Sequence, residues 1–135
     1  MAASEVHAVV RRFLDRINAH DVDGICRLVT VDHLFVDALA QSVRGRERLR
    51  TGWKAYFDLF PDYRVTADRF TERGNVVGVF GSAEATCRMN GRLLPRNHWK
   101  IPAAWQAVVR RGRIAEWRVF CDNQPARRIL GWEPP

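Results

Sequence analysis

Two aspartates stand where an apolar strand ends, and a carboxylate in such a position could move protons. Asp37 follows the apolar residues 34–36, and Asp122 follows residues 113–121. If such a carboxylate faces an apolar cavity, burial disfavours its charged form and brings its pKa toward the range useful for acid–base catalysis. Each aspartate also has an ordinary structural role available. Asp37 could bond the amides of the next loop, and Asp122 could cap the turn before Pro125.

Two polar side chains on a long predicted strand could orient a substrate. His98 and Gln106 are an even number of residues apart within residues 92–109, so they share one face of an extended strand. Pro102 lies between them, and its missing N–H favours a bulge or bend that could shift this alternation. The alternative for His98 is a place at the strand edge, packed beside Trp99.

Aromatic side chains could form the walls of a ligand site. By strand alternation, Phe35 shares a face with Asp37, and Phe120 shares a face with Asp122. A cavity lined by aromatic rings and a few polar groups is typical of a site for a small apolar ligand. The alternative is that these rings simply fill the core. The aromatic residues predicted to line the cavity are Phe35, Trp53, Tyr56 and Phe120.

The same alternation makes a prediction about the outer surface of the last strand. If Asp122 and Phe120 face the cavity, then Trp117, Val119 and Cys121 face away from it. This outward set is apolar, which suits a surface buried between two copies of the chain. We therefore expect a homodimer.

Motifs for metal, cofactor or covalent chemistry are not found in the sequence. The three cysteines are widely spaced, and they form neither a metal-ligand cluster nor a disulfide framework, which favours a reducing cytoplasm. The spacing of His33, Asp37, His98 and Asp122 does not favour a metal site. No apolar run approaches the roughly 18 to 20 residues that span a membrane. We expect no metal, no cofactor, no membrane partner and a cytoplasmic location.

The first half of the sequence predicts three helices and one short strand. Residues 5–19 repeat apolar side chains at the i, i+3, i+4, i+7 spacing of an amphipathic helix. A short second helix is predicted over residues 22–29, and a strand over residues 33–37. After a loop over residues 40–46, a third helix carries aromatic residues at helical spacing and ends before Pro61.

The second half of the sequence predicts a meander of strands. Asn90-Gly91 is a strong hairpin signal between two of them. Helices gathered early and strands gathered late favour an α+β fold with the helices on one face of the sheet, in a single domain over residues 1–135. The predicted strands are residues 63–72, 76–89, 92–109 and 113–122, and a helical turn is predicted over residues 125–130.

Four segments resemble the SnoaL-like, nuclear-transport-factor-like superfamily, which includes polyketide cyclases, ketosteroid isomerase and limonene epoxide hydrolase. Residues 13–25 look like the family's opening helix pair, residues 43–47 and 60–63 like the two ends of its third helix, and residues 112–122 like its closing strand. The resemblance implies a curved, antiparallel-rich sheet that forms a cone around a pocket, closed by the three helices of the N-terminal half. This fold hosts many activities.

The resemblance also implies roles for the candidate residues. Asp37 matches the general base of ketosteroid isomerase, while Asp122 and Gln106 match the terminal aspartate and a pocket glutamine of SnoaL-type cyclases. Phe13 and Ala104 stand where the isomerase has its oxyanion donors, so that mechanism is incomplete here. We predict a cofactor-free isomerase, cyclase or hydrolase acting on a small apolar molecule. Asp122 would be the main acid or base and Asp37 the second, with Gln106 and His98 orienting the substrate.

Two other classes of function stay open at this point. The incomplete catalytic sets suit a non-catalytic module that binds a small ligand or a partner. The net charge of +7 and the pI near 10.3 suit a nucleic-acid binder. However, all basic residues except Lys54 and Lys100 are arginines, and they are scattered along the chain rather than gathered in one tract. Scattered arginines usually form solvated faces, so we expect no nucleic-acid partner.

Overall fold

The computed structural model describes residues 4–132, and its elements follow the predicted order with one short strand added. The first half contains helices α1 (Glu5–Asn18) and α2 (Val22–Arg27), strands β1 (Val29–Val36) and β2 (Ser42–Arg44), and helix α3 (Arg46–Leu59). The second half contains strands β3 (Arg64–Arg73), β4 (Val76–Met89), β5 (Arg92–Arg110) and β6 (Arg113–Cys121), and helix α4 (Gln124–Leu130). No helix within residues 4–132 is long and apolar enough to cross a membrane.

Helix α1 forms where the apolar spacing predicts it. The Ser4 side chain accepts a hydrogen bond from the His7 amide and caps the first turn. The apolar stripe of the helix is buried in the core, and the helix contacts β3, β4 and β6. The buried residues of this stripe are Val9, Val10, Phe13, Leu14 and Ile17.

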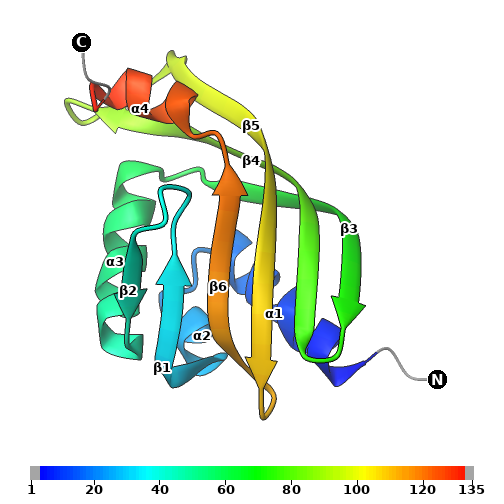
Figure 1. Ribbon diagram of the computed structural model, residues 1–135. Helices are drawn as coiled ribbons and strands as arrows, with labels where there is room; N and C mark the ends of the chain where they lie inside the picture. Colours follow the sequence, from blue (N-terminus) through cyan, green and yellow to red (C-terminus); the bar gives the residue numbers. More distant parts are fainter. Residues whose placement is uncertain (1–3, 133–135) are drawn as a thin grey trace.

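The strands form one curved sheet that does not close into a barrel (Figure 1). Their order is β2-β1-β6-β5-β4-β3, and among the described strands β1 and β6 are the one parallel pair. Helices α1 and α2 lie behind the sheet in Figure 1, α3 runs along its β2 side, and α4 lies at the end where β6 stops. The curved sheet is therefore covered by helices, as the predicted α+β fold requires.

The curvature has local causes in the backbone. Strand β3 carries a register shift between Ala67 and Arg69. Opposite this bulge, a Cβ atom on Gly81 would lie 1.8 Å from the Thr66 carbonyl oxygen, so only glycine lets the two strands approach there. Of the bulge or bend expected at Pro102, the bulge is wrong, because Pro102 pairs with Ser82 in regular register.

Pro102 is tolerated because of where it stands along β5. Strand β6 ends with Cys121 opposite Ala103, so from Pro102 toward its start β5 has a partner strand on one side only. The missing N–H of Pro102 can then face the side of β5 that has no hydrogen-bonded partner strand. Beyond this point the β4–β5 hairpin extends past the rest of the sheet and contacts α4.

Three local features differ from the sequence-based expectation. Strand β1 begins at Val29, so α2 ends at Arg27, earlier than predicted. Strand β2 was expected to be loop, and its three residues are all exposed. His33, the first residue of the strand predicted over residues 33–37, lies inside β1 and is fully buried. Its backbone carbonyl accepts a hydrogen bond from the Gly45 amide, and its ring donates one from Nδ1 to the Ile114 carbonyl.

Candidate active-site cavity

A cavity of about 350 Å³ lies between the inner face of the sheet and helices α3 and α4. This size suits a small organic ligand. Its walls are strongly aromatic, because every tryptophan and both tyrosines of the chain line it. These residues are Trp53, Trp99, Trp105, Trp117, Trp132, Tyr56 and Tyr63.

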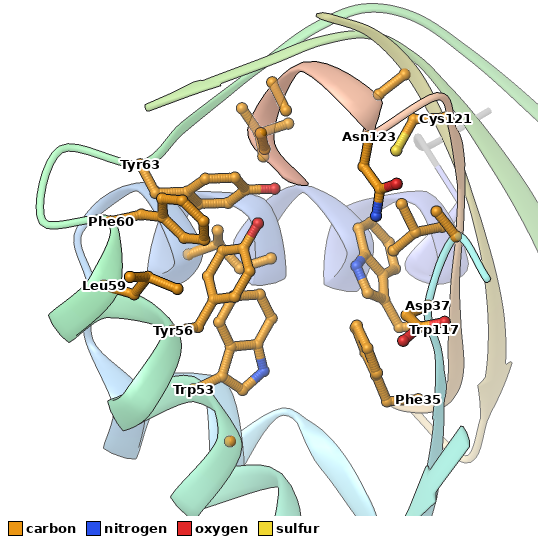
Figure 2. Close-up of a pocket in the computed structure, with 18 of the residues that line it drawn as sticks. Phe35, Asp37, Trp53, Tyr56, Leu59, Phe60, Tyr63, Trp117, Cys121 and Asn123 are labelled. Carbon is orange, nitrogen blue, oxygen red and sulfur yellow. The ribbon is translucent and has the colours of Figure 1, made fainter. Parts of the chain in front are cut away.

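Asp37 is the one carboxylate among the described residues that line the cavity. Its Oδ1 atom accepts hydrogen bonds from the amides of Leu39 and Gln41, both at 2.9 Å. These two bonds hold the carboxylate in place at the end of β1 and leave Oδ2 without a partner among residues 4–132. Figure 2 shows Asp37 and Phe35 on the wall opposite Trp53.

Two phenols form part of the wall that faces Asp37. Tyr56 comes from α3 and Tyr63 from the segment just before β3, and their rings meet edge to face with centroids 4.9 Å apart. The pKa of each phenol is raised, chiefly because burial disfavours the phenolate. Both hydroxyl groups therefore stay protonated and can donate hydrogen bonds.

The remaining polar groups lie around the end of the cavity near α4. Asn123, Arg127 and Cys121 line this part, and Arg48 lines the cavity from α3. Figure 2 shows the Asn123 amide directed into the cavity. The pKa of the Cys121 thiol is raised by burial and then by the nearby negative charges of Asp122 and Asp37. A thiol held in its protonated form is a weak nucleophile, so the geometry does not favour covalent chemistry at Cys121.

Comparison with known families shows to which family the chain belongs. A family model described as the SnoaL-like domain matches residues 10–117, which run from α1 into β6. The chain belongs to the SnoaL-like domain family. Among curated proteins, none matches the sequence.

Solved structures show the same fold as this SnoaL-like domain. A putative SnoaL-like polyketide cyclase from Shewanella putrefaciens aligns with a TM-score of 0.81 at 14% identity, covering 98% of this chain and 89% of that one. A protein of ketosteroid isomerase-like fold from Catenulispora acidiphila, in complex with trimethylamine, has a TM-score of 0.78 at 16% identity, with coverages of 93% and 97%. An LEH-like epoxide hydrolase of M. tuberculosis has a TM-score of 0.77 at 18% identity, with coverages of 95% and 90%. These identities support the fold alone.

The closing strand of the SnoaL-like domain has the opposite orientation to the one predicted. Trp117, Val119 and Cys121 line the cavity, whereas Phe120 is 51% exposed on the outer face. Asp122 is also exposed, and its Oδ1 accepts a hydrogen bond from the Gln124 amide at the start of α4. The alternation itself holds, because Phe120 and Asp122 both lie outside the cavity. The prediction failed at its premise that Asp122 faces the cavity.

The two predicted orienting residues also lie on the outer face of the sheet. His98 is exposed, and its Nδ1 lies 2.9 Å from Thr86 Oγ1. Because the Thr86 hydroxyl donates its single proton to Asp62 at 2.7 Å, the His98 ring must be the donor in this pair. Gln106 donates to Glu116 at 3.4 Å. From Trp99 onward, the alternation within β5 puts its odd-numbered residues inward.

The other predicted residues do come together. Asp37, Phe35, Trp53 and Tyr56 all line the cavity, although their roles stay predictions. Tyr63, Asn123 and the inward row of β5 also line the cavity and were not predicted. A partial signal for that row was present, because Trp99, Ile101 and Trp105 share one parity of the strand, while Lys100 and Gln106 share the other. Within residues 4–132, no three His, Cys, Asp or Glu side chains gather as a possible metal site.

Proposed function

We propose that this SnoaL-like domain is a cofactor-free enzyme that moves a proton on a small, largely apolar molecule, as an isomerase, cyclase or hydrolase does. The observation that supports the proposal is the position and hydrogen bonding of the Asp37 carboxylate. Within the described part of the chain it is the single carboxylate that lines the aromatic cavity, with one oxygen fixed by two amides and no hydrogen-bond partner on the other oxygen. The acid–base role thus passes from Asp122, which lies outside the cavity, to Asp37.

The arrangement supports proton transfer in a simple way. The amides of Leu39 and Gln41 fix the Oδ1 atom of Asp37, so Oδ2 is held in a constant position as the proton acceptor. Oδ2 takes a proton from a substrate carbon, and the same carboxyl group returns a proton to the substrate. The aromatic walls offer contacts to the apolar body of the substrate. Among the proteins that share this fold are a putative SnoaL-like polyketide cyclase and an LEH-like epoxide hydrolase.

Solvent deuterium tests this proposal before the natural substrate is known. A panel of small apolar compounds that bind the protein is incubated in D₂O, and deuterium incorporation is followed by mass spectrometry. Because the carboxyl proton exchanges with solvent, turnover labels the substrate. Asp37→Asn keeps the Oδ1 acceptor for Leu39 and Gln41 but cannot take a proton, so we expect labelling to slow by about a hundredfold or more.

The matched control is Asp122→Asn, which keeps an acceptor for the Gln124 amide at the cavity's edge. We expect it to label substrate at the wild-type rate. Undiminished labelling by Asp37→Asn would exclude Asp37 as the acid or base. If only Asp122→Asn lost labelling, Asp122 rather than Asp37 would be the acid or base.

A non-catalytic ligand-binding module is the second candidate. The observation that favours it is that the loop bonds of Asp37 already give this residue a structural role. This alternative predicts compounds that bind the cavity with measurable affinity but undergo neither labelling nor chemical change over long incubation, in the wild-type protein as in Asp37→Asn.

A further inference from the structure

Three segments that are distant in the sequence meet at the end of the sheet opposite α4 (Figure 1). The amide of Val109, beside the β5–β6 turn, donates to the Asn75 carbonyl in the β3–β4 turn at 2.8 Å. The amide of Ile114, on the other side of the same turn, donates to the Leu28 carbonyl after α2, also at 2.8 Å. These bonds bring five arginines to one end of the molecule, which we call the basic end. They are Arg27, Arg73, Arg110, Arg111 and Arg113.

Most of this positive charge is not neutralised by the protein itself. All five arginines of the basic end are exposed. Arg110 pairs with Asp32 at 2.7 Å, and Glu72, next to Arg73 in the sequence, accepts a hydrogen bond from Ser4. The other four arginines make no ion pair within residues 4–132. The arginines are scattered along the sequence, but the fold gathers four unpaired charges on one surface.

Arg111 stands at the tip of the β5–β6 turn in a backbone conformation that arginine does not favour. Its φ of 53° and the φ of 75° at Gly112 are those of a type I′ turn, which prefers asparagine, aspartate or glycine at the first position. The β4–β5 turn has the same geometry with a preferred residue, since φ is 52° at Asn90 and 73° at Gly91. A strained, exposed arginine with no ion-pair partner among the described residues points to a role for its side chain in binding.

A hollow of about 220 Å³ between α1 and α2 continues the basic surface from Arg27. Arg12 and Arg16 of α1 line it together with Arg27, and Asp15 is the one carboxylate among its described lining residues. Arg16 is held by Asp21 at 3.2 Å, whereas Arg12 makes no ion pair within the part of the chain that the structure describes. The wall of the hollow therefore keeps an excess of positive charge.

The composition of the basic end limits the kind of partner that it fits. A guanidinium group forms two parallel hydrogen bonds with a phosphate group. The centre of a protein–protein interface is usually rich in aromatic and apolar side chains. Of the large apolar side chains that are exposed within residues 4–132, only Val31 lies close in the sequence to any of the five arginines. A row of phosphates can meet these arginines without apolar contacts.

We propose that the basic end binds the phosphate backbone of a nucleic acid, independently of the cavity. This replaces the expectation, drawn from the scattering of arginines along the sequence, that the chain has no nucleic-acid partner. The four unpaired arginines contact the phosphates, with Arg111 at the tip of the surface. If each contacts one phosphate of a duplex, the release of counterions gives log Kd against log salt a slope of magnitude about 3.6. Binding should then be roughly a hundredfold weaker at about 200 mM salt than at about 50 mM.

Fluorescence anisotropy of a fluorescein-labelled DNA duplex of about 20 base pairs tests the proposal. Arg111→Asn removes one charge and places a preferred residue in the type I′ turn. The magnitude of its salt slope should fall by about one, while its melting temperature should rise by about 3 °C. Arg92→Asn is the matched control, because Arg92 is an exposed arginine beside the other type I′ turn, at the far end of β5. It removes the same charge and should keep the wild-type salt slope.

Three results would overturn the proposal. If the two variants lost salt slope equally, the duplex would respond only to net charge and not to the basic end. If the wild-type protein did not bind the duplex at about 50 mM salt, the partner would not be a nucleic acid. If the protein bound vesicles of phosphatidylcholine with about one-third phosphatidylserine through Arg111, but not the duplex, the basic end would be a lipid-binding surface instead.

Discussion

The rings of Tyr56 and Tyr63 meet at 88°, with their centroids 4.9 Å apart, across the loop that joins α3 to β3. The last turn of the helix and the start of the strand are thus joined by an aromatic contact at the wall of the cavity. Pro61 ends the helix between them, so the short loop fixes the distance between the two phenols. A ligand site made this way depends on the sequence of one loop.

The two phenols should resist ionisation in the folded protein. Burial raises the pKa of both, and the chain has no other tyrosine, so tyrosinate absorbance reports this pair alone. The folded-state pKa of each phenol lies above the unfolded value of about 10. The contribution of the two phenols to the free energy of unfolding is therefore complete below about pH 10 and is lost as the pH rises through the folded-state pKa. We expect tyrosinate to appear only as the protein unfolds in alkali. A folded tyrosine titrating near its ordinary value would contradict this.

His33 should make the fold sensitive to mild acid. Its ring is fully buried and donates from Nδ1 to the Ile114 carbonyl at 2.7 Å, while Nε2 has no partner among residues 4–132. Burial lowers the pKa of this imidazole, so its contribution to stability is present above the unfolded value of about 6.5 and is lost as the pH falls below it. Urea unfolding across this range should show a loss of up to about 1.4 kcal/mol per pH unit from this group.

Two variants check the assignment to His33. His33→Asn can still donate to the Ile114 carbonyl but cannot take up a proton, so its free energy of unfolding should fall less steeply in acid than that of the wild type. His7→Asn removes an imidazole from α1 and should leave the wild-type slope. Parallel curves for His33→Asn and the wild type would show that another group is responsible.

The hydroxyl of Thr86 should stabilise the junction between the α3–β3 loop and β4. Asp62 accepts hydrogen bonds from the Thr86 amide at 2.6 Å and from its hydroxyl at 2.7 Å. Burial opposes ionisation of Asp62, but these bonds outweigh it and lower the pKa of the carboxyl. We expect Thr86→Val to reduce the free energy of unfolding by about 1 kcal/mol. The loss should shrink as the pH falls through the Asp62 pKa, because the protonated carboxyl is a weaker acceptor.

Thr66→Val is the matched control, since Thr66 is an exposed residue of the neighbouring strand β3. It should leave the stability near the wild-type value at every pH. If Thr86→Val were as stable as this control at neutral pH, the contact with Asp62 would make no net contribution to the free energy of unfolding.

Elements that bury one face could be predicted from the sequence, and elements without such a face could not. Helix α1 repeats its buried residues at helical spacing, and β4 runs over Val76–Met89 as the turn signals indicate. Strand β2 has no buried residue and hence no alternation to read. It becomes a strand only because β1 pairs with it.

The candidate site was harder to predict, because a shift of one residue reverses every side chain of a strand. The orientation of β6 was inferred backward from Asp122, which lies beyond the strand's end. The apolar alternation of β5 gives the correct answer, since Ala103 pairs with Cys121 and Trp105 with Val119, and paired residues share a face. Tyr63 and Asn123 lie just outside strands, where no periodicity applies.

The outer face of the sheet, rather than the predicted set of Trp117, Val119 and Cys121, is the surface that we propose for the homodimer. Phe80 pairs with Ala104, which pairs with Phe120, so two phenyl rings that are 46% and 51% exposed stand in one row across three strands. A second copy would bury this row. Replacing Phe80 and Phe120 by serine should weaken the dimer at least about tenfold in sedimentation equilibrium. Val31→Ser, at a 70% exposed residue of β1, should not. A monomeric wild-type protein would end this proposal.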